Sequence, residues 1–221
     1  FMTYSFQILM SLMMISMVLM MISRSVASAS RILEVLEEEP DIVDPANAVM
    51  EVKDGEIEFR NVNFKYEDDS EENNLENINI KIKAGETVGI IGSTGSGKTS
   101  LVQLIPRLYD ATNGEVFVGG RNVKEYNIEA LRNSVAMVLQ KNTLFSGTIA
   151  ENLRWGNAEA TEAQIEAAAS SSCVDEFIDR LPGRYDMHIE QGGVNVSGGQ
   201  KQRLCIARAI LKEPKVIILD D

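Results

Sequence analysis

The first 23 residues form an apolar run without a single charged side chain, rich in Met, Ile, Leu and Phe. Twenty-three helical residues span about 35 Å, which is enough to cross the hydrocarbon core of a bilayer. The run therefore predicts a transmembrane helix. A partial apolar stripe continues the helical pattern to residue 39.

Two other interpretations of the run stay open, a buried helix of a soluble protein and a secretory signal peptide. A signal peptide begins with basic residues and ends at a cleavage site, whereas Arg24 and Arg31 follow the run here. Basic residues on that side place the rest of the chain in the cytoplasm. The run begins without Met at position 1, so we expect a piece of a longer protein.

Beyond the helix, the pattern changes to short strands and amphipathic helices. Strands are predicted at 56–66, 75–82, 87–91, 114–120, 134–138 and 216–219. Helices are predicted at 100–105, 160–181 and 198–212. In the first strand the alternation changes phase at Arg60, as at a β-bulge. We expect an α/β fold with a parallel core and short antiparallel strands at its entry.

These patterns divide the chain into three parts. Residues 1–39 are the end of a transmembrane helix and its cytoplasmic extension, and residues 40–55, which contain Pro40 and Pro45, are a linker. Residues 56–221 form the α/β domain. Within them, residues 68–74 are a polar turn, and the predicted helix at 160–181 buries one apolar face.

Residues 92–99 match the phosphate-loop pattern G-x-x-x-x-G-K-[ST] between a predicted strand and a predicted helix. The glycines let successive N–H groups point at phosphate oxygens, and the helix N-terminus favours an anion. Lys98 should reach the β- and γ-phosphates, and the Thr99 hydroxyl should bind Mg²⁺. The alternative is a glycine-rich turn that binds nothing. The nucleotide-binding residues predicted here are Gly92, Ser93, Thr94, Gly95, Ser96, Gly97, Lys98, Thr99 and Ser100.

The formal net charge of −12 is concentrated in one stretch, because residues 31–80 hold 16 acidic and 4 basic side chains. We interpret this stretch as a solvated surface. The remaining residues are balanced in charge and show no cluster of Lys and Arg, so a nucleic-acid partner is not expected. Cys173 and Cys205 are far apart without a C-x-x-C spacing, which indicates reduced thiols and no metal site.

Four further features follow the order found in ABC ATPases. Ser197-Gly198-Gly199-Gln200 resembles the signature sequence, and the apolar run that ends at Asp220 resembles the Walker B strand. Gln140 resembles the Q-loop glutamine, and Tyr66 resembles the aromatic A-loop residue. The segment 142–152 resembles ABC exporters in particular. The sequence is therefore similar to the end of the last transmembrane helix and most of the nucleotide-binding domain of an exporter-type half-transporter.

This resemblance implies ATP and Mg²⁺ as ligands and assigns roles to individual residues. Tyr66 would stack on adenine, and its alternative role is that of an ordinary core aromatic. Thr99, Gln140 and Asp220 would bind Mg²⁺ or its water shell, with Gln140 also near the attacking water. Lys98 would stabilise the transferred phosphate. An ordinary solvated glutamine is the alternative for Gln140.

The signature implies a second chain. Ser197 is of the N-cap type and precedes a helix, whose N-terminus with two glycines can approach an anion closely. In ABC ATPases two domains meet head to tail, and each signature closes over the ATP held by the other. The partner implied is a second ABC half-transporter, in the lipid bilayer of the cell membrane with the nucleotide-binding domains in the cytoplasm.

The residue after Asp220 departs from the family pattern, because ABC ATPases carry Glu there and this chain carries Asp221. The shorter side chain withdraws the catalytic carboxylate, and a misplacement of about 1 Å costs roughly a hundredfold in rate. We therefore expect a degenerate site in a heterodimer, in which this intact signature serves the partner. A homodimer whose Asp221 still works is the alternative.

The leading interpretation is the ATP-binding part of an exporter that couples ATP binding and hydrolysis to transport. The two alternatives are a non-hydrolysing ATP-binding regulatory subunit and a soluble ABC ATPase. The D-loop and switch histidine of the family would lie beyond residue 221, so we expect this stretch of chain to be inactive by itself. The transported substrate does not follow from the sequence.

Overall fold

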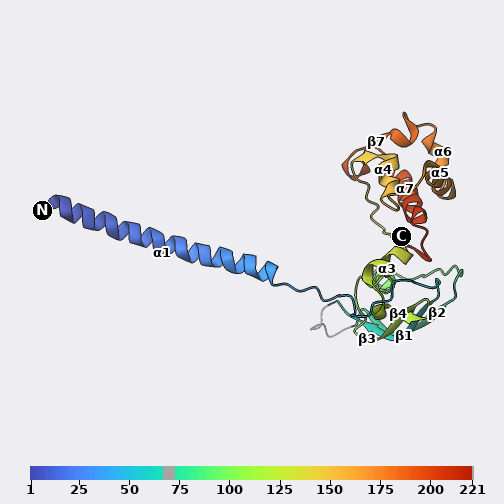
Figure 1. The fold of residues 1–221 in the computed structure, drawn as a ribbon, viewed down its shortest axis with the longest axis horizontal. Helices are drawn as coiled ribbons and strands as arrows, with labels where there is room; N and C mark the ends of the chain where they lie inside the picture. Colours follow the sequence, from blue (N-terminus) through green and yellow to red (C-terminus); the bar gives the residue numbers. More distant parts are fainter. Residues whose placement is uncertain (67–72, 221) are drawn as a thin grey trace. The chain divides into compact units, whose positions relative to one another are not determined.

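The computed structural model describes residues 1–66 and 73–220, which form two compact units, Phe1–Asp41 and Ile42–Asp221 (Figure 1). Asp221 and most of the predicted polar turn at 68–74 lie outside the described residues.

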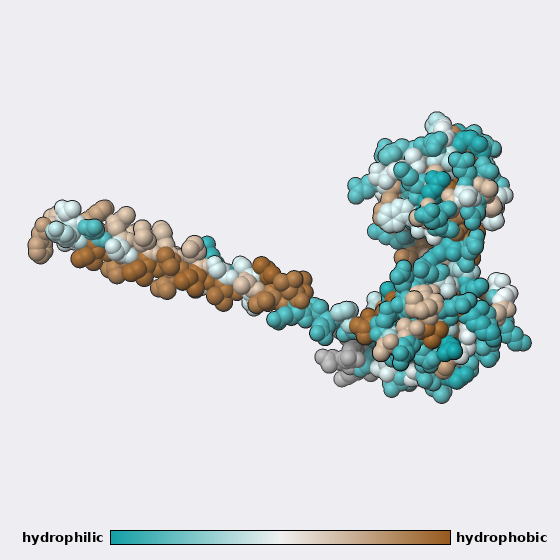
Figure 2. Space-filling view, in the orientation of Figure 1, coloured by the Kyte–Doolittle hydropathy of each residue, from teal (hydrophilic) through white to brown (hydrophobic). Residues whose placement is uncertain are grey.

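The first unit is one helix, α1 (Met2–Leu36), so the helix predicted from the apolar run is confirmed. It is long and apolar enough to cross a membrane, with a mean hydropathy of 2.1 over its most apolar window. Apolar side chains line it along most of its length (Figure 2). The hydroxyls of Ser11, Ser16 and Ser23 donate to carbonyls one turn earlier at 2.9, 3.0 and 3.1 Å. These polar groups are thus satisfied within the helix, as an apolar environment requires.

The second unit contains a mixture of strands and helices, as the sequence predicts. Its strands are β1 (Ile57–Phe64), β2 (Leu75–Ile82), β3 (Asn113–Val118), β4 (Arg121–Asn122), β5 (Val135–Val138), β6 (Gly147–Thr148), β7 (His188–Ile189) and β8 (Val216–Leu219). Its α-helices are α2 (Lys98–Gln103), α3 (Ile128–Ser134), α4 (Ile149–Arg154), α5 (Glu162–Ser171), α6 (Asp175–Ile178) and α7 (Gly198–Leu211). Short 3₁₀ turns lie at η1 (Val123–Glu125), η2 (Arg184–Asp186) and η3 (Gln191–Gly193).

The predicted antiparallel entry is an antiparallel sheet of order β2-β1-β3-β4. The register of β1 shifts between Phe59 and Val62 on one side and between Arg60 and Asn63 on the other. Asn61 has a φ of 48° at this point, so the predicted bulge is confirmed. The inner face of this sheet packs with α2 in one hydrophobic core, in which Val62 and Val118 are completely buried.

The parallel core differs from the prediction. β5 and β8 pair in parallel from Val135 and Val216 onward, but the expected buried strand at Thr87–Ile91 is wrong. That segment forms no strand among the described residues, and Ile91 is 99% exposed. Its apolar composition favours a strand, yet a strand also needs a hydrogen-bonded neighbour. The described edge of β8 is paired with β5 only.

The helical part of this unit, α4 to α7 with β6 and β7, gathers around a second hydrophobic core (Figure 1). The single helix predicted at 160–181 is broken into α5 and α6, because Cys173 adopts a φ of 57° between them. The predicted apolar face is nevertheless buried in this core. Its residues are Ile165, Ala168, Val174, Phe177 and Ile178.

The expected linker at 40–55 is attached to the second unit from Ile42 onward. The Asp44 carboxylate accepts hydrogen bonds from the Ile128 backbone N–H at 2.7 Å and from the Asn127 side-chain amide at 2.6 Å. Val49 pairs with Tyr126, and Val52 is only 2% exposed. Most of this segment is therefore ordered against the domain that follows it.

Candidate functional site: the phosphate loop and its surroundings

The phosphate loop ends where α2 begins, at Lys98. Gly97 caps this helix with a φ of 81°, and Gly95 has a φ of 82°, a left-handed conformation that glycine adopts without strain. A Cβ on Gly97 would lie 2.8 Å from the carbonyl oxygen of Asn74 and 2.8 Å from Leu75 Cδ2. Glycine is therefore required at the position that the motif assigns to it.

The Lys98 ammonium lies over the loop that it follows. Its Nζ donates to the carbonyl oxygens of Gly92 at 2.8 Å and Ser93 at 2.9 Å. These contacts keep the positive charge beside the loop, on a side chain that is half-buried. An anion held by the loop would meet this ammonium directly.

Thr99 and Asp220 are 121 residues apart in the sequence and meet at this loop. The Thr99 hydroxyl lies 3.0 Å from Asp220 Oδ2 and 3.2 Å from Oδ1. The Asp220 backbone N–H donates to the Val138 carbonyl at 2.9 Å, which holds the carboxylate at the end of the β5–β8 pair. A hydroxyl and a carboxylate are oxygen donors of the kind that Mg²⁺ prefers.

A cavity of about 330 Å³ joins these groups into one site. Its lining contains much of the predicted phosphate loop, together with Gln140 and Asp220. The lining residues are Asn74, Thr94, Gly95, Ser96, Gly97, Lys98, Thr99, Ser100, Gln140 and Asp220. The cavity thus brings together Thr94–Ser100, Gln140 and Asp220, which are far apart in the sequence, whereas Gly92, Ser93 and Tyr66 are not among the described residues that line it.

Asn74 is a member of this cavity that the sequence analysis missed. Its side-chain oxygen accepts from the Tyr66 backbone N–H at 3.3 Å, and its own N–H donates to the Phe64 carbonyl at 2.8 Å. Asn74 therefore connects the segment after β1, which carries Tyr66, with the phosphate loop. No sequence motif marks this residue, because its role depends on how β1 and β2 approach Gly97.

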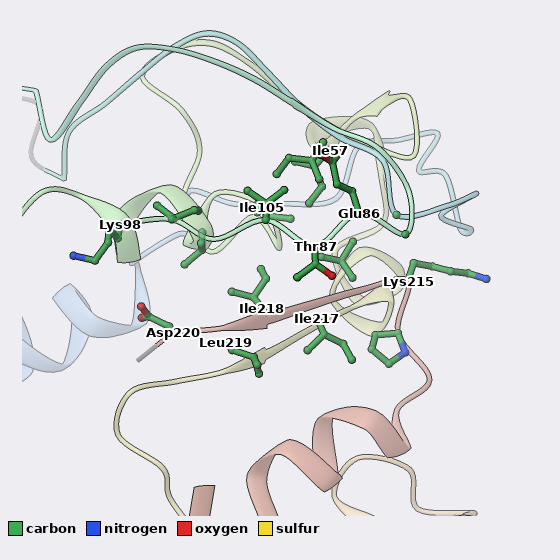
Figure 3. A pocket seen from close by; sticks show the side chains of 18 residues that line it. Ile57, Glu86, Thr87, Lys98, Ile105, Lys215, Ile217, Ile218, Leu219 and Asp220 are labelled. Atoms are coloured by element: carbon green, nitrogen blue, oxygen red, sulfur yellow. The ribbon is translucent and has the colours of Figure 1, made fainter. Parts of the chain in front are cut away.

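A larger cavity of about 550 Å³ lies between the segment Thr87–Ile90 and β8. Figure 3 shows Lys98 and Asp220 at one end of it and Lys215 at the other. Its middle is lined by apolar side chains, which include Ile105 and Ile218. The sequence analysis placed a buried strand at 87–91 and did not anticipate this cavity.

Tyr66 is 48% exposed, and its hydroxyl points back to α2. Tyr66 Oη shares a hydrogen bond of 2.9 Å with Ser100 Oγ and donates to Gln103 Oε1 at 3.2 Å. The ring is therefore partly open to solvent and fixed at its polar end beside the residue that follows Thr99. This is compatible with a stacking surface for a base.

The signature residues form the predicted helix N-cap. Gln200 N–H donates to Ser197 Oγ at 3.3 Å, and Gln200 Oε1 accepts from Ser197 N–H at 2.8 Å, which is a capping box at the start of α7. Ser197, Gly198 and Gly199 are exposed. None of the described residues that line the phosphate-loop cavity comes from this turn.

α7 is also tied to the segment that follows Gln140. Arg208 Nε donates to the Asn152 carbonyl at 2.9 Å, and its Nη1 donates to the Thr143 carbonyl at 3.3 Å. Asn152 in turn bonds both the N–H and the carbonyl of Phe145 at 2.9 Å. Burial lowers the pKa of the Arg208 guanidinium, because desolvation penalises its charge.

The chain matches a family model described as ABC transporter over residues 75–221. It is 43% identical over 202 residues to "Putative multidrug export ATP-binding/permease protein YgaD" of Bacillus subtilis. This match covers 90% of this chain and 34% of that protein. It is 41% identical over 218 residues to "Uncharacterized ABC transporter ATP-binding protein YfiB" of the same organism, covering 99% of this chain and 38% of that protein.

The fold is similar to a structure titled "Structure of a bacterial Atm1-family ABC exporter with ATP bound". The TM-score is 0.82 at 29% sequence identity, and the match covers 89% of this chain and 34% of that one. The chain therefore belongs to the ABC transporter family. It spans about a third of the length of each of these relatives.

Proposed function

We propose that this chain is the ATP-binding part of an ABC exporter, in which ATP binding and hydrolysis at a dimer interface are coupled to transport across a membrane. The observation that carries the proposal is the cavity in which the phosphate loop, Gln140 and Asp220 meet. The relatives support the direction of transport, because their names describe exporters.

The chemistry of the cavity suits a magnesium nucleotide. The N–H groups of the loop and the N-terminus of α2 favour phosphate oxygens, and Lys98 adds a full positive charge. Thr99 and Asp220, 3.0 Å apart, are oxygen donors that would hold Mg²⁺, with Gln140 beside them. When bound, Mg²⁺ neutralises charge on the phosphate oxygens.

Gln140 and Asp221 are proposed to act on the attacking water. Gln140 would orient the water from the same cavity that holds the phosphates. Asp221 follows Asp220 directly in the sequence. With one methylene fewer than Glu, Asp221 would hold the water poorly, and hydrolysis at this phosphate loop would be slow.

A second half-transporter would complete the site. The Ser197 turn is exposed and does not line the phosphate-loop cavity of its own chain. An exposed helix N-terminus with two glycines is suited to the phosphates of a nucleotide held elsewhere. We infer that Ser197, Gly198, Gly199 and Gln200 close over ATP bound to the partner. A heterodimer is favoured because Asp221 weakens the site of this chain.

The apolar helix α1 would anchor the protein in the cell membrane, with the nucleotide-binding domain in the cytoplasm. Its length and hydropathy are sufficient for a span. Arg24 and Arg31 follow the charge-free stretch and lie on the side of the nucleotide site, which favours a cytoplasmic orientation. Contacts with other membrane helices would involve its Ser-rich positions.

A non-hydrolysing regulatory subunit is the second candidate, and Asp221 is the observation that favours it. The full-length protein distinguishes the two when its ATPase rate is measured alone and with a second half-transporter that carries Glu. We expect little turnover alone and robust turnover in the pair. ATP binding without turnover in both preparations would favour the regulatory role.

The same preparation tests the role of Asp221. When two copies of this protein pair, the intact Ser197 turn of each can complete the site of the other. Asp221→Glu should then raise the ATPase rate of the protein alone by about a hundredfold, because it restores the reach of the carboxylate. Asp179→Glu is the matched control, since the Asp179 side chain is 72% exposed and belongs to the helical part of the domain. Fast hydrolysis by the unmutated protein alone, unchanged by Asp221→Glu, would contradict a degenerate site.

A further inference from the structure

Three aromatic rings form a cluster beside the phosphate loop, and the sequence analysis singled out only one of them. The Tyr66 ring lies 4.8 Å from the Phe64 ring and 5.1 Å from the Tyr109 ring, centroid to centroid. The interplanar angles are 78° and 88°. Perpendicular contacts of this kind are a favoured geometry for aromatic pairs. Two rings thus restrict the plane of the third.

Tyr109 is mounted on a rigid turn after α2. Arg107 adopts a φ of 52° and is only 5% exposed. Its guanidinium donates to both carboxylate oxygens of Asp110, at 2.9 and 3.2 Å. Leu108 N–H also donates to the Gln103 carbonyl at 3.0 Å. These bonds fix the backbone on either side of Tyr109. They therefore also restrict the position of its ring against the Tyr66 ring.

The Tyr66 hydroxyl is hydrogen-bonded to Ser100 and Gln103 of α2, the helix that follows the phosphate loop. Its backbone is held by Asn74. These contacts fix the backbone of Tyr66 and its hydroxyl oxygen. They do not fix the plane of the ring, because the ring can rotate about the axis that runs from its attachment point to the hydroxyl without moving either. Resistance to that rotation must come from packing against the ring, which Phe64 and Tyr109 provide.

We propose that Tyr109 is a positioning residue for the base of the nucleotide, which holds the Tyr66 ring in the plane on which adenine stacks. The inference rests on the proposed function, in which Tyr66 is the stacking surface. Phe64 is buried in the core of the antiparallel sheet and has a structural role as well. Tyr109 is 41% exposed, so its removal disturbs the core less.

The test compares two ligands of the full-length protein, MgATP and magnesium tripolyphosphate, which has phosphates but no base. Tyr109→Leu and Tyr109→Met should weaken MgATP binding by about three- to tenfold, because the loss of one aromatic contact frees the Tyr66 ring. Neither should change the affinity for tripolyphosphate. Tyr109→Phe should restore the affinity for MgATP. Tyr185→Leu, in the helical part of the domain, is the matched control and should alter neither ligand.

Tyr66→Ala separates this inference from the proposed function. If Tyr66→Ala weakens MgATP binding and the two non-aromatic variants of Tyr109 do not, only the role of Tyr109 is overturned. If Tyr66→Ala leaves MgATP binding unchanged, the stacking role of Tyr66 fails, and the inference fails with it. Equal weakening of MgATP and tripolyphosphate by Tyr109→Leu would show a structural role in the phosphate site and would also overturn the inference.

Discussion

At the residue scale, the contact between Thr99 and Asp220 joins two motifs that are 121 positions apart in the chain. The backbone of each residue is also fixed. Thr99 lies in the first turn of α2, and the Asp220 N–H donates to the Val138 carbonyl. The fold of the chain alone therefore brings the two oxygen donors together. This preorganisation is what a magnesium site requires.

Thr99→Val should weaken the Mg²⁺ dependence of ATP binding by the full-length protein. Removal of the hydroxyl deletes one oxygen donor, and the concentration of Mg²⁺ needed for half-maximal ATP binding should rise on the order of tenfold or more. Thr99→Ser keeps the hydroxyl and is the matched control. A Mg²⁺ titration of ATP binding that is the same for Thr99→Val and the unmutated protein would contradict the assignment.

Motifs predicted which residues meet at the cavity, because their residue types and order are visible in the sequence, and the roles of these residues stay predictions. Thr94–Ser100, Gln140 and Asp220 line one cavity, as their order in the chain led us to expect. Asn74 and Tyr109 could not be found in this way, since their importance comes from contacts that exist only after folding. Asp221 lies outside the described residues, so its role stays a prediction.

At the scale of elements, local pattern was sufficient where neighbours in sequence decide the structure. The bulge in β1, the extended conformation of β8 and the N-cap of α7 were all predicted. The local sequence pattern gave wrong predictions where the structure depends on a strand partner far away in the sequence or on a single backbone angle. Thr87–Ile91 has the composition of a strand without a paired neighbour among the described residues, and the φ of 57° at Cys173 divides one predicted helix into two.

The connection between α4 and α7 holds the helical part of the domain to the segment after Gln140. Arg208 reaches Asn152 and Thr143, and Asn152 bonds Phe145. These hydrogen bonds link that segment to α7, the helix that follows the Ser197 N-cap. The buried part of this network is more important for stability than ion pairs on the surface of the same helix.

Arg208→Met should lower the free energy of unfolding by about 1–3 kcal/mol, because it leaves polar groups of Asn152 and Thr143 without their donors. The melting temperature should fall by several degrees. Arg203→Met, on the same helix, removes an ion pair to Glu176 whose side chains are 41% and 61% exposed, and should have a smaller effect. Equal melting temperatures of the two variants would argue against this difference.

At the scale of the whole molecule, the two candidate phosphate-binding features are separate in the structure. One is the cavity around Lys98 and the other is the exposed turn at Ser197. A dimer in which each turn meets the cavity of the partner gives both features a role. In a heterodimer with a degenerate site on this chain, the productive site would combine the partner's phosphate loop with this turn.

This arrangement predicts unequal effects of two substitutions on the ATPase rate of the heterodimer. Ser197→Arg should reduce the rate by about a hundredfold or more, because it removes a phosphate contact from the productive site and introduces bulk there. Lys98→Ala should reduce it much less, since it affects the degenerate site. Ser171→Arg, at an exposed position of α5, is the matched control. The reverse order of the two effects would exclude the arrangement.

The central claim is that the loop around Lys98 binds the triphosphate of ATP, and equilibrium binding of MgATP to the full-length protein without a partner tests it most directly. Lys98→Ala should weaken binding by about tenfold or more, because the charge-assisted contact to the phosphates is lost. Lys53→Ala is the control, since that side chain is 83% exposed, and should bind as the unmutated protein does. Unchanged MgATP affinity of Lys98→Ala would contradict the account.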